Sequence, residues 1–337
     1  MKAFEIQAWG SVENLKLTSR PAPTPGPGQI LLRIRAASIN FRDHLMLLGS
    51  YNPKQRLPLI PLGDGAGEVT EVGAGVTRFK PGDRVAGLFN QRWMGGPPTR
   101  ERLRTTLGGP LDGMLAEYAV LPEEGAVFIP EHLSFEEAAA LPIAGVTAWR
   151  ALVSYGSLKA GDIVLVQGTG GVSVFALQFA KAHGARVIVT SSSDEKLERA
   201  RALGADHTIN YRTKPDWERL AWDYSGGTGV DNVIEVGGAG TFEKSLKCVR
   251  SGGQVSVIGV LSGVATNLNV LPVLMTSIRV QGITVGSRDD FEAMNRAISQ
   301  GRLRPVLDKT YSFEEAREAY KCLASGQHFG KIAIRVN

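Results

Sequence analysis

Closely spaced glycines are the residues in this sequence with the clearest chemical potential. They follow the apolar run Ile163–Gln167 in the pattern G-x-G-x-x-S, and a helical pattern comes after them. Between a strand and a helix, the first glycine permits a tight turn. The second leaves room for a pyrophosphate, which backbone N–H groups at the helix start bind. The pattern therefore predicts a dinucleotide site whose contacts include Gly168, Gly170, Gly171 and Val172.

Ser173 stands where this pattern usually has glycine or alanine. A small residue is needed there because the helix lies close to the strand. Serine is small, and its hydroxyl can bond back to the preceding turn of its own helix. We therefore expect the loop to keep its function.

The residues after the next predicted strand, Arg186–Thr190, indicate the type of dinucleotide. An NAD site usually has a carboxylate about 20 residues beyond the glycines, where it binds the ribose 2′-hydroxyl. Here that place holds Ser191–Ser193, whose hydroxyls can donate to a 2′-phosphate, and Lys181 and Lys196 can add positive charge. NADP(H) is therefore favoured over NAD(H). The alternative is that the serines only cap the following helix, which is compatible with either cofactor.

The pattern of secondary structure changes after about Pro130. Before it, short alternating or β-branched runs are separated by turn sequences such as "PAPTPGPG" and "KPGD", which predicts a barrel-like β-rich body. After it, strand and helix patterns alternate, which is typical of a parallel sheet with helices on both faces. The predicted strands are 163–167, 186–190, 207–210, 230–236, 253–259 and 279–284, and the predicted helices are 172–183, 195–203, 214–223 and 241–249.

Composition excludes several classes of protein. The 337 residues are 43% hydrophobic and 21% charged, which is ordinary for a globular protein of two domains. No apolar run is long enough to span a bilayer, and the N-terminus has no signal-peptide core, so we expect no membrane partner. The two cysteines favour a reducing, cytoplasmic location. The formal charge of +5 is scattered, and the arginines between 92 and 104 lie in a Gly/Pro-rich segment, so we expect no nucleic-acid partner.

Several longer motifs together resemble one family. The segments "VLVQGTGGVSVFALQFAKAHGARVIV", "LGADHTINY", "VTEVGAGVTRFKPGDRVAG" and "LPIAGVTAWRAL" are similar to those of the medium-chain dehydrogenase/reductases. The chain most resembles the zinc-independent quinone oxidoreductase (zeta-crystallin-like) branch and the bacterial proteins labelled zinc-type alcohol dehydrogenases. This resemblance implies a GroES-like catalytic domain, residues 1–122 and 284–337, and a Rossmann doubly wound domain, residues 123–283.

The resemblance also bears on metal binding. Zinc members carry a catalytic Cys, His and Cys, and on this sequence their places fall at Asn40, Gly63 and Ile143. An amide is a weak zinc ligand, and glycine and isoleucine offer no ligand atom. The four cysteines of the structural zinc lobe are also missing around residues 90–110. We therefore predict that no metal is bound.

The zinc-free branch implies a set of cofactor contacts. Around the adenosine 2′-phosphate they are Lys181, Ser192 or Ser193, Lys196 and Tyr211, with Ser191 beside them. Near the nicotinamide they are Thr147, Gly259 and Val260. Less specific matches are Gly286, Ser287, Arg288 and Lys331.

Without a metal, reduction of a conjugated C=C bond is easier to arrange than oxidation of an alcohol, because hydrogen bonds alone can stabilise an enolate. The resemblance places Asn40 near the substrate carbonyl and Tyr51 at the mouth of the site, and we add Arg42 as a candidate catalytic residue. Leu45 occupies a place where some quinone reductases have a tyrosine, so the match to a quinone site is incomplete. The expected activity is NADPH-dependent transfer of hydride to quinones, enones or enals.

Two alternatives remain open from the sequence. One is an NAD(P)-dependent alcohol dehydrogenase, and the other is an NADPH-binding protein without catalytic activity. The sequence names neither the substrate nor a proton donor. A homodimer is expected from the resemblance, because such proteins often pair their Rossmann sheets through a strand like 279–284; the alternative is a plain edge strand.

Overall fold

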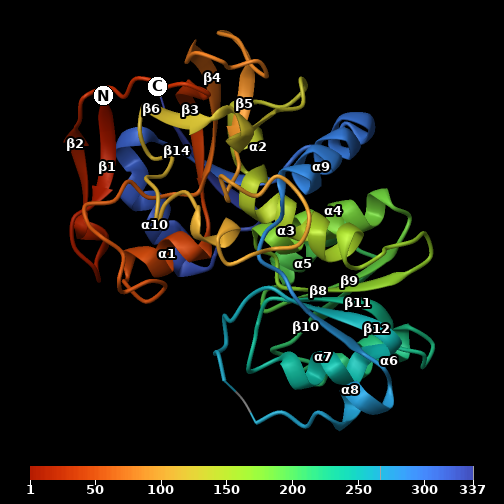
Figure 1. The fold of residues 1–337 in the computed structure, drawn as a ribbon. Coiled ribbons are helices and arrows are strands. Elements are labelled where there is room, and N and C mark those ends of the chain that lie inside the picture. The colour runs from red at the N-terminus through yellow and green to blue at the C-terminus, as the bar shows by residue number, and fades with distance from the viewer. Residues whose placement is uncertain (266, 337) are drawn as a thin grey trace. The chain divides into compact units, whose positions relative to one another are not determined.

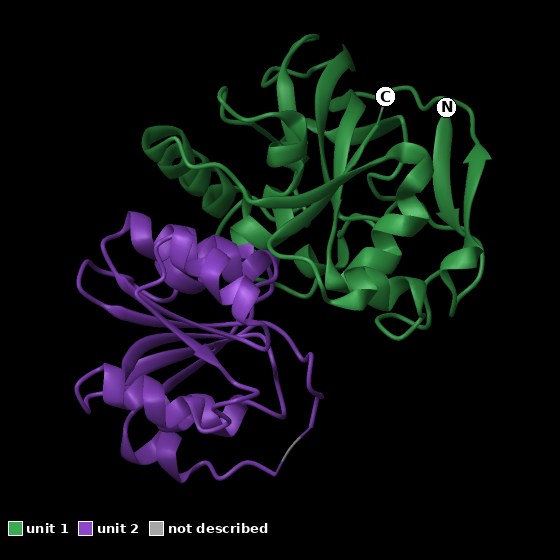
Figure 2. Cartoon of the chain, turned by 180° about the vertical axis from the view of Figure 1, so that it is seen from behind, with its two compact units in different colours: residues 1–146, 286–337 green, residues 147–285 purple. Residues whose placement is uncertain are grey.

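The computed structural model describes residues 1–265 and 267–336, which form two compact units. One unit comprises residues 1–146 and 286–337, and the other comprises residues 147–285 (Figure 2). The boundary expected after residue 122 therefore differs from the observed one. Residues 123–146 belong to the first unit because β7 (Ala126–Phe128) pairs with a strand of its sheet and α2 (Phe135–Ala139) packs on that sheet.

The first unit is built around a seven-stranded sheet whose order is β14-β15-β3-β4-β5-β7, with β6 also paired to β3. Its core joins apolar side chains of these strands to α10 and to the separate β1–β2 hairpin. Figure 1 labels most of the elements of this unit. The elements are β1 (Lys2–Ile6), β2 (Leu15–Ser19), β3 (Gln29–Ile39), α1 (Phe41–Leu47), β4 (Asp64–Val72), β5 (Arg84–Gly87), β6 (Tyr118–Pro122), β7, α2, α9 (Arg288–Gly301), β14 (Leu307–Ser312), α10 (Ala316–Ser325) and β15 (Lys331–Arg335).

Three neighbouring strands of this sheet bring residues that are distant in the sequence to the same end of the sheet. In the antiparallel pairs, Ser38 of β3 lies opposite Asp64 of β4, and Ile39 lies opposite Ile332 of β15. Asn40 follows β3 directly. The end of β3 and the beginnings of β4 and β15 therefore meet, although their residues are up to 291 positions apart in the chain.

The second unit contains a six-stranded parallel sheet of order β10-β9-β8-β11-β12-β13, which confirms the predicted doubly wound Rossmann fold. Every residue of the central strand β8 is buried, as expected for a strand covered on both faces. The elements are β8 (Ile163–Gln167), α4 (Gly171–Ala182), β9 (Arg186–Ser191), α5 (Asp194–Ala202), β10 (His207–Asn210), α6 (Trp217–Tyr224), β11 (Val230–Glu235), α7 (Phe242–Cys248), β12 (Val249–Val257), α8 (Leu271–Met275) and β13 (Arg279–Gly282), with the short α3 (Val146–Trp149) at the boundary of the units.

Within residues 1–265 and 267–336, no helix has the length and apolar character needed to cross a membrane.

Candidate functional site

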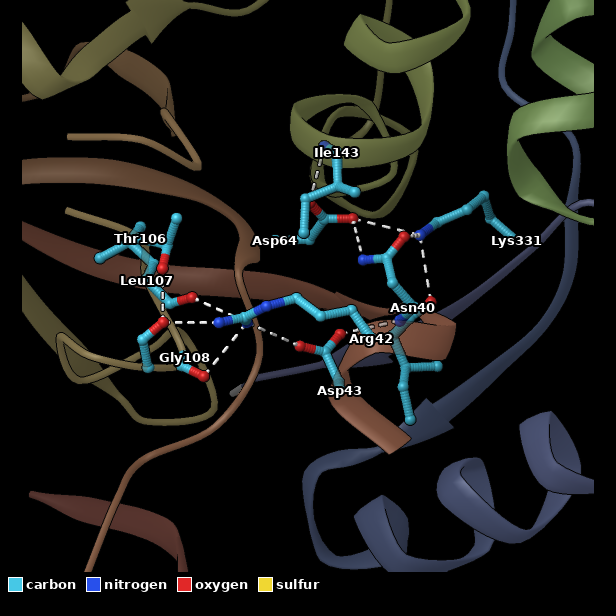
Figure 3. A network of polar contacts seen from close by, with 11 residues as sticks. Asn40, Arg42, Asp43, Asp64, Thr106, Leu107, Gly108, Ile143 and Lys331 are labelled. Atoms are coloured by element: carbon cyan, nitrogen blue, oxygen red, sulfur yellow. Dashed lines mark hydrogen bonds and ion pairs between the residues drawn. The ribbon is translucent and has the colours of Figure 1, made fainter. Parts of the chain in front are cut away.

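A polar cluster lies at one end of the inner strands of the first unit's sheet (Figure 3). It consists of Asn40, Asp64 and Lys331. The Lys331 ammonium donates to Asn40 Oδ1 at 2.6 Å, to Asp64 Oδ2 at 3.1 Å and to the Ile39 carbonyl at 3.1 Å. Asn40 Nδ2 donates to Asp64 Oδ2 at 2.8 Å. Asn40 is half-buried, whereas the exposed fractions are 0% for Asp64 and 3% for Lys331. Only the amide of the cluster is therefore open to a bound molecule.

The charges in this cluster compensate one another. Burial raises the pKa of the Asp64 carboxyl, and the positive charge of Lys331 opposes that rise, as do hydrogen bonds from Asn40 and from the Ile143 N–H at 2.9 Å. An ion pair in an apolar interior is tolerated when its remaining hydrogen-bonding atoms are also satisfied. All three ammonium hydrogens and both carboxylate oxygens have partners here, so the pair meets that condition.

Arg42 holds a neighbouring loop. Its guanidinium donates to the carbonyls of Leu107, Gly108 and Gly109 at 3.1, 3.1 and 2.5 Å. It also lies over the rings of Tyr51 and Phe89, with centroids at 5.1 and 4.9 Å. These contacts give Arg42 a structural role, and the catalytic role expected from the sequence stays a prediction. Tyr51 is 54% exposed, so its ring is accessible beside that loop.

Asp43 is a buried acid beside the cluster. Its Oδ2 accepts the Asn40 backbone N–H at 2.9 Å, and its Oδ1 lies 3.6 Å from Arg42 Nη1. Burial raises the pKa of Asp43 to about 6, although the charge of Arg42 lowers it. Burial also lowers the pKa of the neighbouring His44. Asp43 thus fixes the backbone that presents Asn40 and does not face a bound molecule.

Two of the three places that hold zinc ligands in the family, Gly63 and Ile143, offer no ligand atom here, and apolar side chains surround Gly63. An ideal Cβ added to Gly63 would lie 2.7 Å from Phe89 Cδ2 and 2.8 Å from Ile143 Cδ1. Phe89 and Ile143 are 8% and 9% exposed. Because the donor set lacks two ligands and the space for one is occupied, these residues do not fit a catalytic zinc. No group of three or more His, Cys, Asp or Glu side chains suited to a metal occurs among the described residues.

The glycine loop in the second unit fits a bound pyrophosphate. Gly168 has φ +72°, which a residue with a side chain adopts only with strain, and it makes the turn from β8. Gly170 is the N-cap of α4, and a Cβ added there would meet nothing within 4 Å. The helix start has no side-chain cap, so the N–H groups of its first turn are available to an anion.

Ser173 supports this loop in a way that differs from our expectation. Its hydroxyl donates to the carbonyl of Gln167, the last residue of β8, at 2.7 Å, and not to its own helix. Ser173 is 3% exposed, so it lies at the crossing of strand and helix. The serine therefore links α4 to β8 where glycine or alanine would only allow close packing.

The end of β9 carries the hydroxyl residues expected near the adenosine. Ser193 caps α5, since its Oγ accepts the Lys196 N–H at 3.3 Å. Ser191 accepts the Tyr211 N–H through its backbone carbonyl at 3.0 Å, which brings Tyr211 to the same edge of the sheet. Tyr211 is 43% exposed. The structure thus brings Ser191, Ser192, Ser193, Lys196 and Tyr211 together.

Lys181 does not belong to this group. It lies in the last turn of α4, where its ammonium binds Asp206 Oδ2 at 2.8 Å, and the same oxygen accepts the Val187 N–H at 2.7 Å. Val187 is near the start of β9, about 13 Å along an extended strand from Ser191. A crossover helix runs back toward the starts of the strands. Lys181 therefore lies near the amino ends of the strands, whereas the serines lie at the carboxyl end of β9. This position does not agree with the contact to the 2′-phosphate that the sequence predicted for Lys181.

The remaining expected cofactor contacts fall in both units. Thr147, Gly259 and Val260 belong to the second unit, and a Cβ at Gly259 would lie 2.5 Å from the Val236 carbonyl. In the first unit, Ser287 caps α9, and Arg288 forms ion pairs with Glu124 and Glu292. Gly286 also lies there. Lys331 belongs to the polar cluster, where its ammonium contacts Asn40, and its expected role at the cofactor stays a prediction.

Sequence reasoning missed one buried acid in the second unit. Glu235 ends β11 with an exposed fraction of 0%, and its oxygens accept from the N–H groups of Gly237 and Gly238 at 2.8 and 2.9 Å. It also accepts from Gln167 Nε2 at 2.7 Å and Thr241 Oγ1 at 2.6 Å. The sequence did contain a signal for this acid, because Glu235 is a charged residue near the end of the predicted strand 230–236. Glu235 orders the loop that packs against Gly259.

Comparisons with known proteins agree with this architecture. Residues 26–131 match the alcohol dehydrogenase GroES-like domain, and residues 171–300 match the zinc-binding dehydrogenase family. The zinc-type alcohol dehydrogenase-like protein C1773.06c of Schizosaccharomyces pombe is 43% identical over 319 residues, 92% of each chain. The 2-methylene-furan-3-one reductase of Solanum lycopersicum is 33% identical and covers 99% of this chain and 79% of its own.

A solved structure of an NAD-dependent alcohol dehydrogenase has a TM-score of 0.91, 38% identity and complete coverage of both chains. Sequence similarity of this extent, together with the two matched domains, establishes the family. The chain is a member of the medium-chain dehydrogenase/reductase superfamily of oxidoreductases.

Proposed function

We propose that this oxidoreductase transfers hydride from NADPH to quinones or to the conjugated C=C bond of enones or enals, without a metal. The observation that carries the proposal is the Asn40 amide, which is half-buried and held by Lys331 and Asp64 where zinc-dependent members have a cysteine ligand. An amide N–H is a suitable donor to a carbonyl oxygen that becomes an enolate. The relative from Solanum lycopersicum, whose name describes reduction of an unsaturated ketone, supports this substrate class.

The preference for NADPH rests on the end of β9. No carboxylate follows Ser191 until Asp194, whose Oδ1 accepts from Asn210 Nδ2 at 2.8 Å. Hydroxyl groups at Ser192 and Ser193, with the positive charge of Lys196, suit a 2′-phosphate, which a carboxylate would repel. The backbone N–H groups at the start of α4 would hold the pyrophosphate.

The proposed chemistry divides between the cofactor and the chain. When bound, the nicotinamide supplies the hydride that adds to the β-carbon of the substrate. Asn40 Nδ2 would donate to the substrate carbonyl oxygen and stabilise the negative charge that forms there. The apolar side chains of Phe89 and Ile143 would exclude water from that oxygen, which strengthens the hydrogen bond.

An alcohol dehydrogenase is the second candidate, favoured by the solved structure of an NAD-dependent alcohol dehydrogenase. A spectrophotometric screen tests both candidates. Purified protein, checked for bound zinc by elemental analysis, is mixed with NADPH or NADH and a panel of enones, enals and quinones, and with NADP⁺ or NAD⁺ and a panel of alcohols. Consumption of NADPH with an enone or enal, at less than stoichiometric zinc, is the expected result.

Oxidation of alcohols alone, or stoichiometric zinc bound to the active protein, would contradict the proposal. Tight binding of NADPH without turnover of any compound would instead favour a cofactor-binding protein without catalytic activity. The Asn40→Ala variant is expected to lose about 100-fold in kcat, as for removal of an oxyanion donor.

A further inference from the structure

We propose that Lys331 and Asp64 are positioning residues that fix the orientation of the Asn40 amide, so that its second Nδ2 hydrogen is directed to the substrate oxygen. This inference rests on the proposed function. It names the residues that take over the task of the zinc ion in zinc-dependent members. Lys331 and Asp64 do not touch the substrate in this scheme, because both are buried behind Asn40.

The first argument is the orientation of the amide. A lysine ammonium only donates hydrogen bonds, so the Asn40 atom 2.6 Å from Nζ must be the carbonyl oxygen. A carboxylate only accepts, so the atom 2.8 Å from Asp64 Oδ2 must be the amide nitrogen. The two charged partners thus fix the amide in a single orientation (Figure 3). One hydrogen of Nδ2 is used by Asp64, and the other has no protein acceptor among the described residues.

The second argument is electrostatic. A cation beside the amide oxygen withdraws electron density from the amide and makes its N–H groups stronger donors. The effect is largest in a site screened little by water, and Lys331 is 3% exposed. Asp64 compensates the charge, which allows the ammonium to be buried at all. The cluster therefore supplies a fixed N–H donor whose two charged neighbours balance each other, whereas a zinc ion would bind the oxygen directly.

The third argument counts against the role expected for Lys331 at the cofactor. Its three hydrogens are taken by Asn40, Asp64 and the Ile39 carbonyl. A contact to a ribose or phosphate would require at least one of these bonds to break. Lys331 also opens β15, whose pairing with β3 fixes its backbone beside Asn40.

The experiment compares three variants with the wild type. Lys331→Met removes the charge at similar length, and Lys331→Met combined with Asp64→Asn restores charge balance in case the single variant fails to fold. The matched control is Lys309→Met, which removes an exposed lysine from the adjacent strand β14 at the position paired with Ile332. Circular dichroism and thermal unfolding establish which variants are folded.

In steady-state assays with an enone and NADPH, the folded double variant is expected to lose about 30-fold to 100-fold in kcat, because the oxyanion donor is no longer oriented. Its dissociation constant for NADPH is expected to change less than about threefold, and the isotope effect with deuterated NADPH should rise as hydride transfer becomes slower. The Lys309→Met control should match the wild type in all three measurements. A purely structural role for Lys331 would not separate kcat from nucleotide binding in this way.

Two results would overturn the inference. One is a folded double variant with wild-type kcat, and the other is weakened NADPH binding with unchanged kcat, which would make Lys331 a cofactor contact. If the wild type itself reduces no enone, enal or quinone, the proposed function fails. The orientation is then judged separately from spectra of protein labelled with [15N]asparagine, in which the Asn40 side-chain signals, assigned with Asn40→Ala, should move in the double variant and stay in Lys309→Met.

Discussion

Two lysines that the sequence places near the same phosphate have different surroundings in the fold. Lys196 lies in the first turn of α5, beside the serines that end β9. Lys181 lies in the last turn of α4 and is paired with Asp206 at 2.8 Å. The difference allows one lysine to serve as the control for the other.

Lys196→Ala is expected to raise the dissociation constant for NADPH by about tenfold or more, because a charge-assisted hydrogen bond contributes roughly 1.5–3 kcal/mol. The constant for NADH should change less than about threefold. Lys181→Ala should leave both constants near the wild-type values. Fluorescence titration of each variant with both nucleotides measures these effects, and equal losses for NADPH and NADH would contradict the phosphate assignment.

The sequence could predict residue types at this site better than their positions. The serines, Tyr211 and the glycine loop each follow a strand, and the carboxyl ends of parallel strands lie at the same end of the sheet. Their roles in binding the cofactor stay predictions. Lys181 was misplaced because it lies ten residues after the helix start at Gly171, which is about 15 Å along the helix axis. Lys331 is 291 positions from Asn40, so only the sheet pairing could reveal their contact.

At the level of elements, the spacing between α4 and β8 determines how closely a pyrophosphate can approach the glycine loop. Ser173 sets this spacing, since its hydroxyl binds the last carbonyl of β8. The strands of this unit were predicted closely, and β8 and β10 have the predicted bounds, whereas the helix α8 was not predicted. The alternation of apolar runs and helical patterns is strong in a sheet buried on both faces.

Ser173→Val is expected to weaken binding of both NADPH and NADH by about tenfold, because a larger side chain at this buried crossing pushes α4 away from β8. Ser173→Ala is the matched control. It loses one hydrogen bond, about 1 kcal/mol of stability, yet keeps the close approach, so nucleotide binding should change less than about threefold. Weak binding in the alanine variant with normal binding in the valine variant would reverse this interpretation.

The first unit was harder to predict at this scale. Its strands were recognised in part, but β2, β7 and β14 were missed, and residues 123–146 were assigned to the wrong side of the boundary. Short strands such as β7, with three residues, have too little sequence to show a period. The partner of β7 is β5, with Val85 paired to Phe128, and a local sequence pattern does not contain that pairing.

For the whole molecule, the most prominent surface feature lies in the second unit. β13 is the edge strand of the parallel sheet, and an exposed apolar surface precedes and includes it. Exposed fractions reach 84% at Val264 and 73% at Leu274. This 260–280 surface consists of Val260, Leu261, Val264, Leu268, Val270, Leu271, Leu274, Met275 and Val280.

We propose that the 260–280 surface and the β13 edge pair with a second copy of the chain, as expected from the resemblance. An apolar patch of this kind on a globular protein marks an interface. Leu274→Glu combined with Met275→Glu is expected to shift the protein from dimer to monomer in light scattering coupled to gel filtration. Leu111→Glu, which changes a 43% exposed leucine of the first unit, is the control and should remain dimeric. A monomeric wild type would refute the proposal.

The packing around Gly63 limits how this enzyme could be converted into a zinc enzyme. Histidine at that position would place its first side-chain carbon within 2.7 Å of Phe89 and 2.8 Å of Ile143. Cysteine at position 40 would also stand beside the Lys331 ammonium, which repels a divalent cation. Each reverse step is therefore harmful until the others are in place, so single substitutions cannot rebuild a metalloenzyme here. An engineer would have to enlarge the pocket and neutralise the lysine before adding any ligand.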